Sequence, residues 1–430
     1  MERNAIKNLL EWKNDAERKP MVLKGARQVG KTWLMQEFGR AHYDDVAYFN
    51  FDEEDELKSI FKANKNPKRI VELLSTVLGK SILPGKTLLI FDEIQECPDA
   101  LNALKYFNEK ANEYHVLTAG SLLGTLLAQS KTYPVGKVNI LNVYPLDFGE
   151  FLHAIDQTLY SYYANIQKGQ HIEDVFHNRL LEAYNYYLIV GGMPECVSSW
   201  QKYKDSARVL KIQRELVSLY ENDFSKYNGK VNAAKLLMIF RSIPSQLAKA
   251  NAKFLYGALR KGGRARDFEE SIEWLVSAGL VNRVCNVSKI EHPLAVFEKL
   301  GQFKLFLFDT GLLKCMVGLD NSAILLKSNY QFKGALSENY VLQQLCTQKD
   351  LAVHYYAAKN KELDFLLQYG ADVVPIEVKA GENKVAASFK KYVSDYKPRW
   401  AVRFSKLGYK KDGAFINIPL YLAGRVTELL

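Results

Sequence analysis

Short apolar runs alternate with polar, helix-forming stretches along the first third of the chain. Five of these runs have the length and composition of buried strands, namely Met21–Lys24, Val46–Phe51, Thr87–Phe91, His115–Ala119 and Val138–Val143. The dipeptide Tyr144-Pro145 ends the last of them. Parallel strands need crossover connections that are usually helical, so this alternation predicts an α/β fold built on a doubly wound parallel sheet.

The rest of the chain shows three further patterns. A helical pattern runs from about Phe148 to Tyr227 and is interrupted by Gly191-Gly192-Met193-Pro194. Between residues 231 and 313, helices precede two strand-like runs, Leu280–Val287 and Phe303–Asp309. After a polar stretch near residues 321–330, the pattern predicts helix, strand, strand, helix and strand in turn: Gly334–Leu345, Glu362–Leu367, Val373–Lys379, Ala386–Tyr396 and Arg399–Phe404.

A glycine-rich loop joins the first predicted strand to the next helix. Its residues match the pattern G-x-x-x-x-G-K-[ST] in full: Gly25, Ala26, Arg27, Gln28, Val29, Gly30, Lys31 and Thr32. The glycines let backbone N–H groups surround phosphates, Lys31 reaches the β and γ oxygens, and the Thr32 hydroxyl ligates Mg²⁺. The helix that starts here turns its N-terminus toward the phosphates. We therefore predict that this phosphate loop binds ATP and Mg²⁺.

Two carboxylates follow the apolar strand that ends at residue 91. Asp92 would hold the magnesium ion and Glu93 would polarise the attacking water, and the alternative is a solvated acidic turn. A later strand ends in the polar tip of residues 118–121, where Ser121 would contact the γ-phosphate. The strand Val46–Phe51 intervenes in the chain between the phosphate loop and the acidic strand. This order favours the catalytic-glutamate class of P-loop ATPases over the kinase class.

These motifs together resemble a family of prokaryotic AAA-type ATPases. The resemblance rests on Lys19–Thr32, on Pro145-Leu146-Asp147-Phe148 and on Gly191-Gly192-Met193-Pro194-Glu195, and it covers nearly the whole chain. In that family the ATPase domain is followed by a domain of unknown function. Such proteins are similar to the signal-transducing ATPases with numerous domains, which act as switches more often than as fast motors. The resemblance implies slow basal ATP hydrolysis in a protein that awaits a partner.

A winged-helix pattern fits the region after residue 231. Two short helices are expected at Ser245–Leu247 and Phe254–Leu259, and a third at Arg266–Ala278, before the two strand-like runs. In such a fold the third helix enters a DNA groove. Four basic side chains lie at its approach: Arg260, Lys261, Arg264 and Arg266. They could contact DNA or act as arginine fingers, or the module could only connect domains or dock on protein.

The last predicted hairpin brings three charged residues onto one face. If Gln368 pairs with Val373, the same register sets Asp364 opposite Glu377, and Lys379 shares their face. The opposite face is then wholly apolar. Two carboxylates set opposite each other repel, and a magnesium ion between them would remove that cost. The two carboxylates are also expected to keep the pKa of Lys379 raised.

Glu338, on the preceding helix, can supply a further carboxylate to this metal. The set of Glu338, Asp364 and Glu377-Val378-Lys379 resembles the PD-(D/E)xK core of restriction-endonuclease-like proteins. The resemblance implies that the acids bind the metal and that Lys379 activates water or stabilises the phosphorane. Leu363 stands where that motif has proline. The alternatives are a nuclease-like fold retained for binding and a simple charged hairpin.

Composition bears on the choice of partner and compartment. The net charge of +10 favours an anionic partner, with nucleic acid ahead of a membrane, and is equally compatible with a solvated basic surface. The five cysteines are scattered without CxxC spacing, which fits a reduced cytoplasmic protein. The charged N-terminal stretch lacks the apolar core of a signal peptide, and no uncharged run resembles a membrane span.

We therefore expect a P-loop AAA-type ATPase domain at residues 1–150, a helical lid at 151–230, a winged-helix-like domain at 231–325 and a restriction-endonuclease-like domain at 326–430. The leading hypothesis is an ATP-regulated enzyme that binds and cleaves DNA. The alternative is a nucleotide-dependent switch that binds DNA or a protein partner and cleaves nothing.

Overall fold

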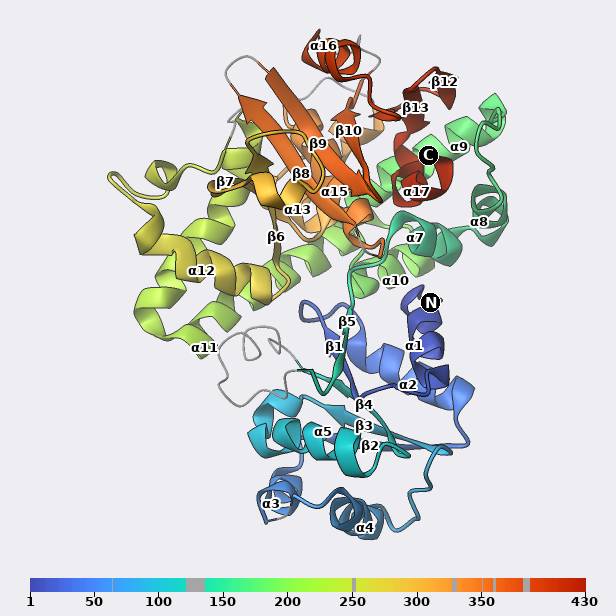
Figure 1. The fold of residues 1–430 in the computed structure, drawn as a ribbon, viewed down its shortest axis with the longest axis vertical. Helices are drawn as coiled ribbons and strands as arrows, with labels where there is room; N and C mark the ends of the chain where they lie inside the picture. Colours follow the sequence, from blue (N-terminus) through green and yellow to red (C-terminus); the bar gives the residue numbers. More distant parts are fainter. Residues whose placement is uncertain are drawn as a thin grey trace. The chain divides into compact units, whose positions relative to one another are not determined.

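The computed structural model describes residues 1–63, 65–120, 136–249, 253–326, 331–349, 351–358, 361–381 and 387–430. These residues form two compact units (Figure 1). The N-terminal unit consists of residues 2–144 with residues 277–280. The C-terminal unit consists of residues 145–276 and 281–430, together with Met1.

A five-stranded sheet of order β2-β3-β4-β1-β5 forms the centre of the N-terminal unit. Its strands are β1 (Met21–Lys24), β2 (Asp45–Asn50), β3 (Thr87–Asp92), β4 (His115–Ala119) and β5 (Asn139–Asn142). Every pair is parallel, which confirms the predicted α/β fold with a parallel sheet. In space, β4 separates β1 from β3. The loops that follow β1 and β3 therefore meet at the carboxyl edge of the sheet, where ligands of such sheets bind.

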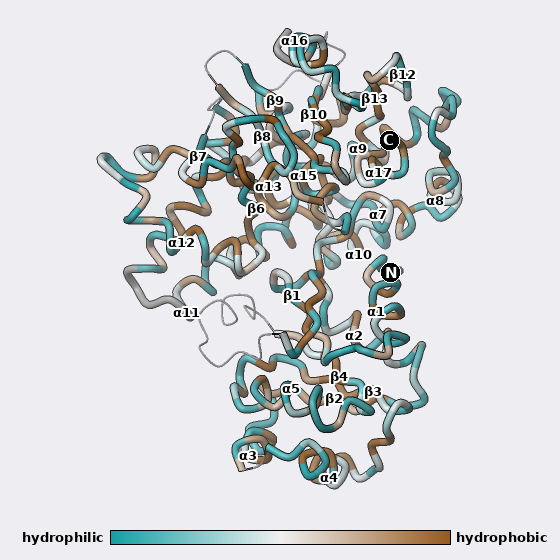
Figure 2. The backbone as a smooth tube through the Cα atoms, in the orientation of Figure 1, coloured by the Kyte–Doolittle hydropathy of each residue, from teal (hydrophilic) through white to brown (hydrophobic). Residues whose placement is uncertain are grey.

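Buried apolar residues of this sheet and its helices form one core cluster. Figure 2 shows the backbone of these elements coloured by the hydropathy of each residue. The helices are α1 (Ala5–Asn14), α2 (Lys31–His42), α3 (Asp55–Ala63), α4 (Pro67–Leu78) and α5 (Pro98–Lys110), with the 3₁₀ turn η1 (Ile94–Glu96). Strand β3 is buried at every position, as a central parallel strand must be. The Phe91 ring lies 5.5–6.2 Å from those of Phe49, Phe51, Phe61 and Phe107, in tilted and edge-on contacts. This aromatic cluster fixes β3, and with it the two carboxylates at its end.

Helices make up the first half of the C-terminal unit. They are α7 (Phe148–Ile155), α8 (Gln157–Ala164), α9 (Asp174–Val190), α10 (Pro194–Tyr203), α11 (Ser206–Ala248) and α12 (Ala265–Ser277). The long helix α11 runs across the boundary expected between residues 230 and 231. Among the described residues, no helix has the length and apolar character needed to cross a membrane.

The glycine pair that interrupts the helical pattern packs against neighbouring backbone. Gly191 has a φ of +74°, and a Cβ atom on Gly192 would lie 2.1 Å from the carbonyl oxygen of Leu146. The Gly192 N–H donates to buried Asp309 at 2.7 Å, and the Leu312 N–H donates to the other oxygen of that carboxylate at 2.9 Å. Close approach to these groups explains why both positions are glycine.

A mixed eight-stranded sheet of order β12-β13-β11-β10-β9-β8-β6-β7 forms the second half of this unit. Its strands are β6 (Val281–Val287), β7 (Glu298–Leu307), β8 (Ala352–Ala358), β9 (Lys361–Tyr369), β10 (Asp372–Val378), β11 (Ala401–Ser405), β12 (Lys410–Asp412) and β13 (Phe415–Pro419). The remaining elements are α13 (Thr310–Val317), α14 (Asn321–Leu325), α15 (Lys333–Cys346), α16 (Ala387–Tyr396), α17 (Val426–Leu429) and the turns η2 (Tyr256–Ala258), η3 (Leu294–Phe297) and η4 (Leu420–Arg425). A parallel pairing of Asn286 with Tyr355 joins the β6–β7 hairpin to the other strands.

The two short helices predicted before α12 do not form as separate helices. Residues 245–247 are the last turn of α11, and residues 254–259 contain only the 3₁₀ turn η2. Pro244 lies within α11 without ending it, directly after the buried residues Leu236, Phe240 and Ile243. The third predicted helix is present as α12.

Candidate nucleotide site and carboxylate cluster

Backbone geometry explains the glycines of the phosphate loop, which lies between β1 and α2. Gly30 has a φ of +90° and a left-handed conformation that disfavours a side chain. A Cβ atom on Gly25 would lie 2.1 Å from the carbonyl oxygen of Val143. Glycine at both positions is therefore required by the local structure of this loop.

Lys31 starts helix α2 and is almost fully buried. Its Nζ atom donates to the carbonyl oxygens of Gly25 at 3.0 Å and Ala26 at 2.7 Å. Burial lowers the pKa of Lys31 to about 8, although nearby Glu93 and Asp92 favour the charged form. The ammonium group therefore lies inside the loop, and its charge depends on pH near neutrality.

The Thr32 hydroxyl and the Asp92 carboxylate are in direct contact. Thr32 Oγ1 donates to Asp92 Oδ2 at 2.6 Å, and the Tyr48 hydroxyl donates to the same oxygen at 3.0 Å. The Glu93 N–H donates to the other carboxylate oxygen at 3.0 Å. Burial raises the pKa of Asp92, and these hydrogen bonds oppose that shift. Hydroxyl and carboxylate oxygens are the ligands that Mg²⁺ prefers, so this pair fits the metal.

Glu93 follows β3 in a strained backbone conformation. Its φ is +46°, a left-handed value that is uncommon for residues other than glycine. Gln95 Nε2 donates to Glu93 Oε2 at 2.5 Å, which orients the carboxylate. A Cβ atom on Gly120, at the end of β4, would lie 2.0 Å from Gln95 Oε1. Ser121, the predicted γ-phosphate contact, lies outside the described residues.

Sequence reasoning missed Tyr48 and Gln95 as members of this site. Tyr48 lies on β2, and the parallel pairing of Asn50 with Asp92 brings β2 alongside the acidic strand. Gln95 lies two residues after Glu93. A polar side chain this close to a candidate catalytic carboxylate was the available sequence signal for Gln95; nothing local marked Tyr48.

The register of the β9–β10 hairpin is the predicted one. Val373 pairs with Gln368, and Ile376 pairs with Phe365. The pairing ends there, and the Val378 N–H donates instead to Asp364 Oδ2 at 2.7 Å. Leu363, Phe365 and Val378 are buried, as predicted. Leu363, however, packs in one cluster with Leu366, because the register of β9 against β8 shifts in this stretch, so the strict alternation predicted for β9 is interrupted there. The other side also contains a buried leucine and proline at positions 366 and 375, so charge occupies only the end of the hairpin.

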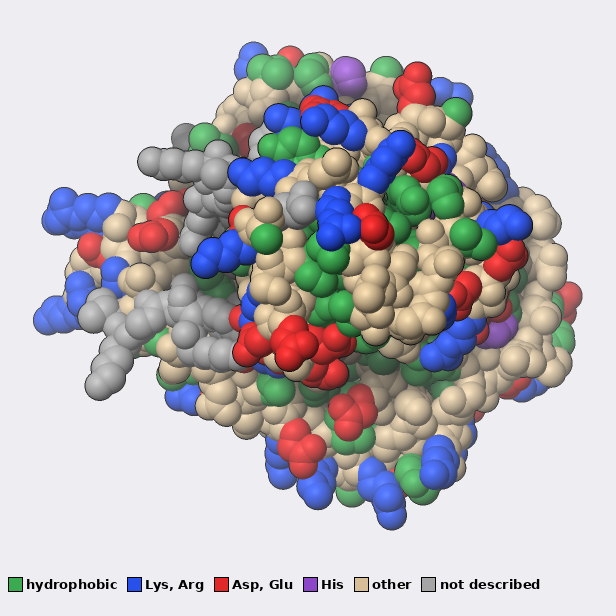
Figure 3. All heavy atoms as spheres, turned by 90° about the horizontal axis from the view of Figure 1, so that it is seen from below, with side chains coloured by type: hydrophobic (Ala, Val, Ile, Leu, Met, Phe, Trp, Pro, Cys, Tyr) green, Lys and Arg blue, Asp and Glu red, His purple; other side chains and the backbone are tan. Residues whose placement is uncertain are grey.

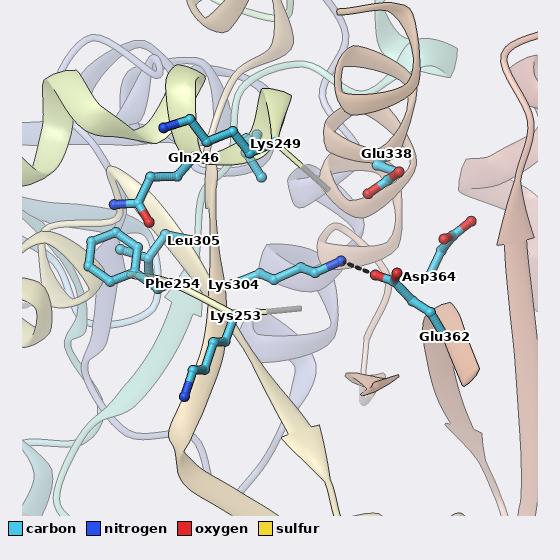
Figure 4. A pocket seen from close by; sticks show the side chains of 10 residues that line it. Gln246, Lys249, Lys253, Phe254, Lys304, Leu305, Glu338, Glu362 and Asp364 are labelled. Atoms are coloured by element: carbon cyan, nitrogen blue, oxygen red, sulfur yellow. Dashed lines mark hydrogen bonds and ion pairs between the residues drawn. The ribbon is translucent and has the colours of Figure 1, made fainter. Parts of the chain in front are cut away.

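The charged end of the hairpin forms a carboxylate–lysine cluster with α15 and β7. Lys379 Nζ lies 3.1 Å from Glu377 Oε1. Lys304, from β7, lies 2.8 Å from Glu362 Oε1. The cluster consists of Lys304, Glu338, Glu362, Asp364, Glu377 and Lys379. A cavity of about 140 Å³ opens on it, with Lys249 and Lys253 on its wall (Figure 4). The sequence did not indicate that Lys304 or Glu362 would belong here.

Burial and crowding shift the protonation of this cluster. Burial raises the pKa of Glu338 to about 8, and the Asp364 charge adds to the shift. Burial also raises the pKa of Asp364, against the effect of Lys379. Burial alone would lower the pKa of Lys379. The charges of Asp364 and Glu377 outweigh the effect of burial, so the pKa of Lys379 is raised, as predicted. Within the described ranges, no three His, Cys, Asp or Glu side chains are arranged to hold a metal ion.

The four basic residues near α12 are all solvent-exposed. Arg266 Nε lies 4.0 Å from Asp267 Oδ1, and the Arg264 backbone N–H donates to Asp267 Oδ2 at 3.0 Å. Figure 3 shows a group of acidic side chains among scattered lysines and arginines on one face of the molecule. The net charge of +10 is therefore not spread as a continuous basic surface over that face.

Comparison with known proteins gives family matches over three segments of the chain. Residues 17–152 match a family model described as an AAA domain. Residues 181–323 and 333–422 match two models described as domains of unknown function, DUF8612 and DUF4143. No curated protein matches the chain in sequence. The first match spans the phosphate loop, Asp92 and the parallel sheet, so this part of the chain is similar to an AAA domain.

Three solved structures illustrate the distant similarity of the fold. The Walker-type ATPase PABY2304 of Pyrococcus abyssi is 14% identical, with a TM-score of 0.45, and the match covers 74% of this chain and 95% of that one. AMPPCP-bound DnaA from Aquifex aeolicus is 13% identical, with a TM-score of 0.27, and the match covers 64% of this chain and 85% of that one. Aeropyrum pernix ORC1 in complex with DNA is 12% identical, with a TM-score of 0.26, and the match covers 75% of this chain and 92% of that one. At TM-scores below 0.5, none of them defines the function of this chain.

Proposed function

We propose that the N-terminal unit hydrolyses ATP with Mg²⁺ and that its nucleotide state controls a nucleic-acid site in the C-terminal unit. The observation that carries the first half is the 2.6 Å contact between Thr32 Oγ1 and Asp92 Oδ2 beside the buried Lys31 ammonium. In this proposal the two oxygens would ligate Mg²⁺, and the Lys31 ammonium would meet the phosphates that the loop surrounds.

Each residue of the site has a distinct role in this proposal. Lys31 would neutralise charge on the β and γ phosphates, and Thr32 and Asp92 would hold a metal ion, which would supply further positive charge beside the phosphoryl group. Glu93 accepts a proton from the attacking water. Gln95 is a positioning residue, because its amide holds the Glu93 carboxylate at 2.5 Å.

Replacing Glu93 by glutamine tests the hydrolysis step. Glu93→Gln should bind ATP as wild type does, because the phosphate and metal ligands remain, and should lose at least a hundredfold in turnover, on the order of one general base. Glu96→Gln, three residues further on, is the matched control and should turn over normally. Turnover in Glu93→Gln equal to wild type would reject the assignment of Glu93.

The second half of the proposal is a magnesium-dependent phosphodiesterase at the carboxylate–lysine cluster. Four carboxylates stand against two lysines in this cluster, and the raised pKa values of Glu338 and Asp364 are what an added cation would relieve. Glu377 and Asp364 would hold the metal, and Lys379 would stabilise charge on the phosphorus. Exposed basic residues near α12 would hold DNA.

Metal binding and nicking test this half separately. In a Lys31→Ala background, which disables the phosphate loop, calorimetric titration with Mg²⁺ or Mn²⁺ should give a signal that Glu377→Ala removes. Asp412→Ala, an exposed acid on the same sheet, is the matched control. Nicking of plasmid DNA should be lost in Glu377→Ala while ATP hydrolysis persists in the otherwise wild-type chain.

A nucleotide-dependent switch without cleavage is the second candidate. The observation that favours it is the Lys304 ammonium, which already neutralises Glu362 within the cluster at 2.8 Å. A cluster neutralised by lysines has less need of a metal ion. Metal titrations that are identical for wild type and Glu377→Ala, or metal binding without nicking of any nucleic acid, would favour the switch.

A further inference from the structure

A second cavity lies beside the carboxylate–lysine cluster. Its volume is about 230 Å³, and Lys289, Tyr356, Glu362, Tyr392 and Tyr396 are among the residues that line it. Glu362 also lines the cavity that opens on the cluster, so both cavities adjoin this residue of β9. The volume is below that of pockets for drug-sized ligands and suits a single heterocycle.

Two tyrosines of α16 line this second cavity, which we call the aromatic cavity. The rings of Tyr392 and Tyr396, one helical turn apart, stack with centroids 4.6 Å apart and planes at 19°. Tyr392 is buried in a cluster with Leu363 and Phe389, which anchors α16 on β9 (Figure 1). Tyr396 is 61% exposed. The inner ring is therefore fixed by the core, and the outer ring offers a flat aromatic face to solvent.

The charges around the aromatic cavity suit a nucleotide better than an apolar ligand. Lys289 and Lys361 are exposed at its rim and can neutralise phosphates. Glu291 and Glu362 also line it, and carboxylates accept hydrogen bonds from the exocyclic amino groups of cytosine and adenine. Stacking rings with flanking lysines are the features by which proteins bind single strands.

We propose that the aromatic cavity binds one unpaired, amino-bearing base of a single-stranded nucleic acid whose backbone continues to the carboxylate–lysine cluster. The inference rests on the proposed nucleic-acid role of the C-terminal unit and specifies its substrate as unpaired strand. A base enters the cavity only when it is free of its partner, because the rings must reach a whole face of the base.

The test measures binding of a fluorescein-labelled twelve-nucleotide oligodeoxycytidine to the full chain by anisotropy in EDTA. Tyr396→Ala should raise the Kd about fivefold or more, the loss expected for one stacking contact. Tyr396→Phe keeps the ring and should bind as wild type does. Tyr203→Ala removes an exposed tyrosine of α10 in the same unit and should change nothing.

Two changes of probe sharpen the test. Oligodeoxythymidine, which lacks amino groups, should bind more weakly than oligodeoxycytidine. An abasic oligomer should bind wild type and Tyr396→Ala equally, because no base is left to stack. An unchanged Kd for Tyr396→Ala, equal binding of the two pyrimidine oligomers, or no binding by wild type would overturn the inference.

The absence of divalent metal separates this test from the test of cleavage. If the protein binds the oligomers as expected but never nicks DNA, the base-binding role of the aromatic cavity is retained and the phosphodiesterase activity is rejected. If the protein nicks DNA but binds oligodeoxycytidine equally with and without the Tyr396 ring, only the proposed base-binding role of the aromatic cavity is rejected.

Discussion

Raising the pH from 7 to 9 should weaken ATP binding through Lys31. Burial lowers the pKa of this lysine to about 8, below its value of about 10.4 in an unfolded chain. The group is therefore charged below about pH 8 and neutral above it. Because only the ammonium attracts the phosphates, affinity is greatest at low pH and is lost as the pH rises through the folded pKa.

The size of the effect follows from the protonated fraction. With a pKa of about 8, roughly nine-tenths of Lys31 is charged at pH 7 and roughly one-tenth at pH 9, so the Kd for ATP should rise about tenfold. Binding of a fluorescent ATP analogue, measured at constant magnesium and ionic strength in steps of pH, gives the profile.

Lys31→Arg supplies the control for this profile. Its guanidinium group stays charged throughout the range, so its Kd should not vary with pH, whatever its absolute value. A wild-type profile as flat as that of Lys31→Arg would refute the reasoning, because the charge of Lys31 would then not change in this range.

Three further perturbations have defined outcomes. Lys31→Met should raise the Tm of the nucleotide-free protein while abolishing ATP binding, because it removes a charge whose burial costs up to about 3 kcal/mol, and a lower Tm would contradict this. Asp309→Ala should destabilise the C-terminal unit by roughly 2–5 kcal/mol in urea unfolding, since it strips buried N–H groups of their acceptor, whereas exposed Asp320→Ala should cost about 1 kcal/mol as a lost helix cap. Neutralising the basic group near α12 should flatten the salt dependence of duplex DNA binding, and an unchanged slope would exclude that surface; the residues are Arg260, Lys261, Arg264 and Arg266.

Local patterns determined much of the fold and the nucleotide site. The spacing from Gly25 to Thr32 marks the phosphate loop because each of its constraints acts within eight residues. The change from an apolar run to Asp92 likewise showed in the sequence where the acidic strand ends. In the last hairpin, closing the strands around the short loop at residues 369–372 predicted the pairing of Gln368 with Val373, which the structure confirms.

Other members of the sites depended on tertiary structure. Lys304 reaches Glu362 across 58 positions of sequence, and the two meet only because β6–β7 joins the sheet that contains β9. Tyr48 reaches Asp92 through the pairing of β2 with β3. No periodicity specifies such contacts, because side-chain patterns report which face of an element is buried and not which element covers it.

The motifs themselves could be predicted from the sequence, whereas the residues packed around them could not. The sequence determined that a phosphate loop follows β1, that carboxylates follow β3 and that Asp364 and Glu377 share one end of a hairpin. Only the folded chain decided that Lys304 enters their cluster and that the stacked tyrosines of α16 lie over the neighbouring cavity. The physical reason is that hydrogen bonds and turns act between near neighbours, whereas the packing that assembles a site acts between distant segments after the backbone has set their positions.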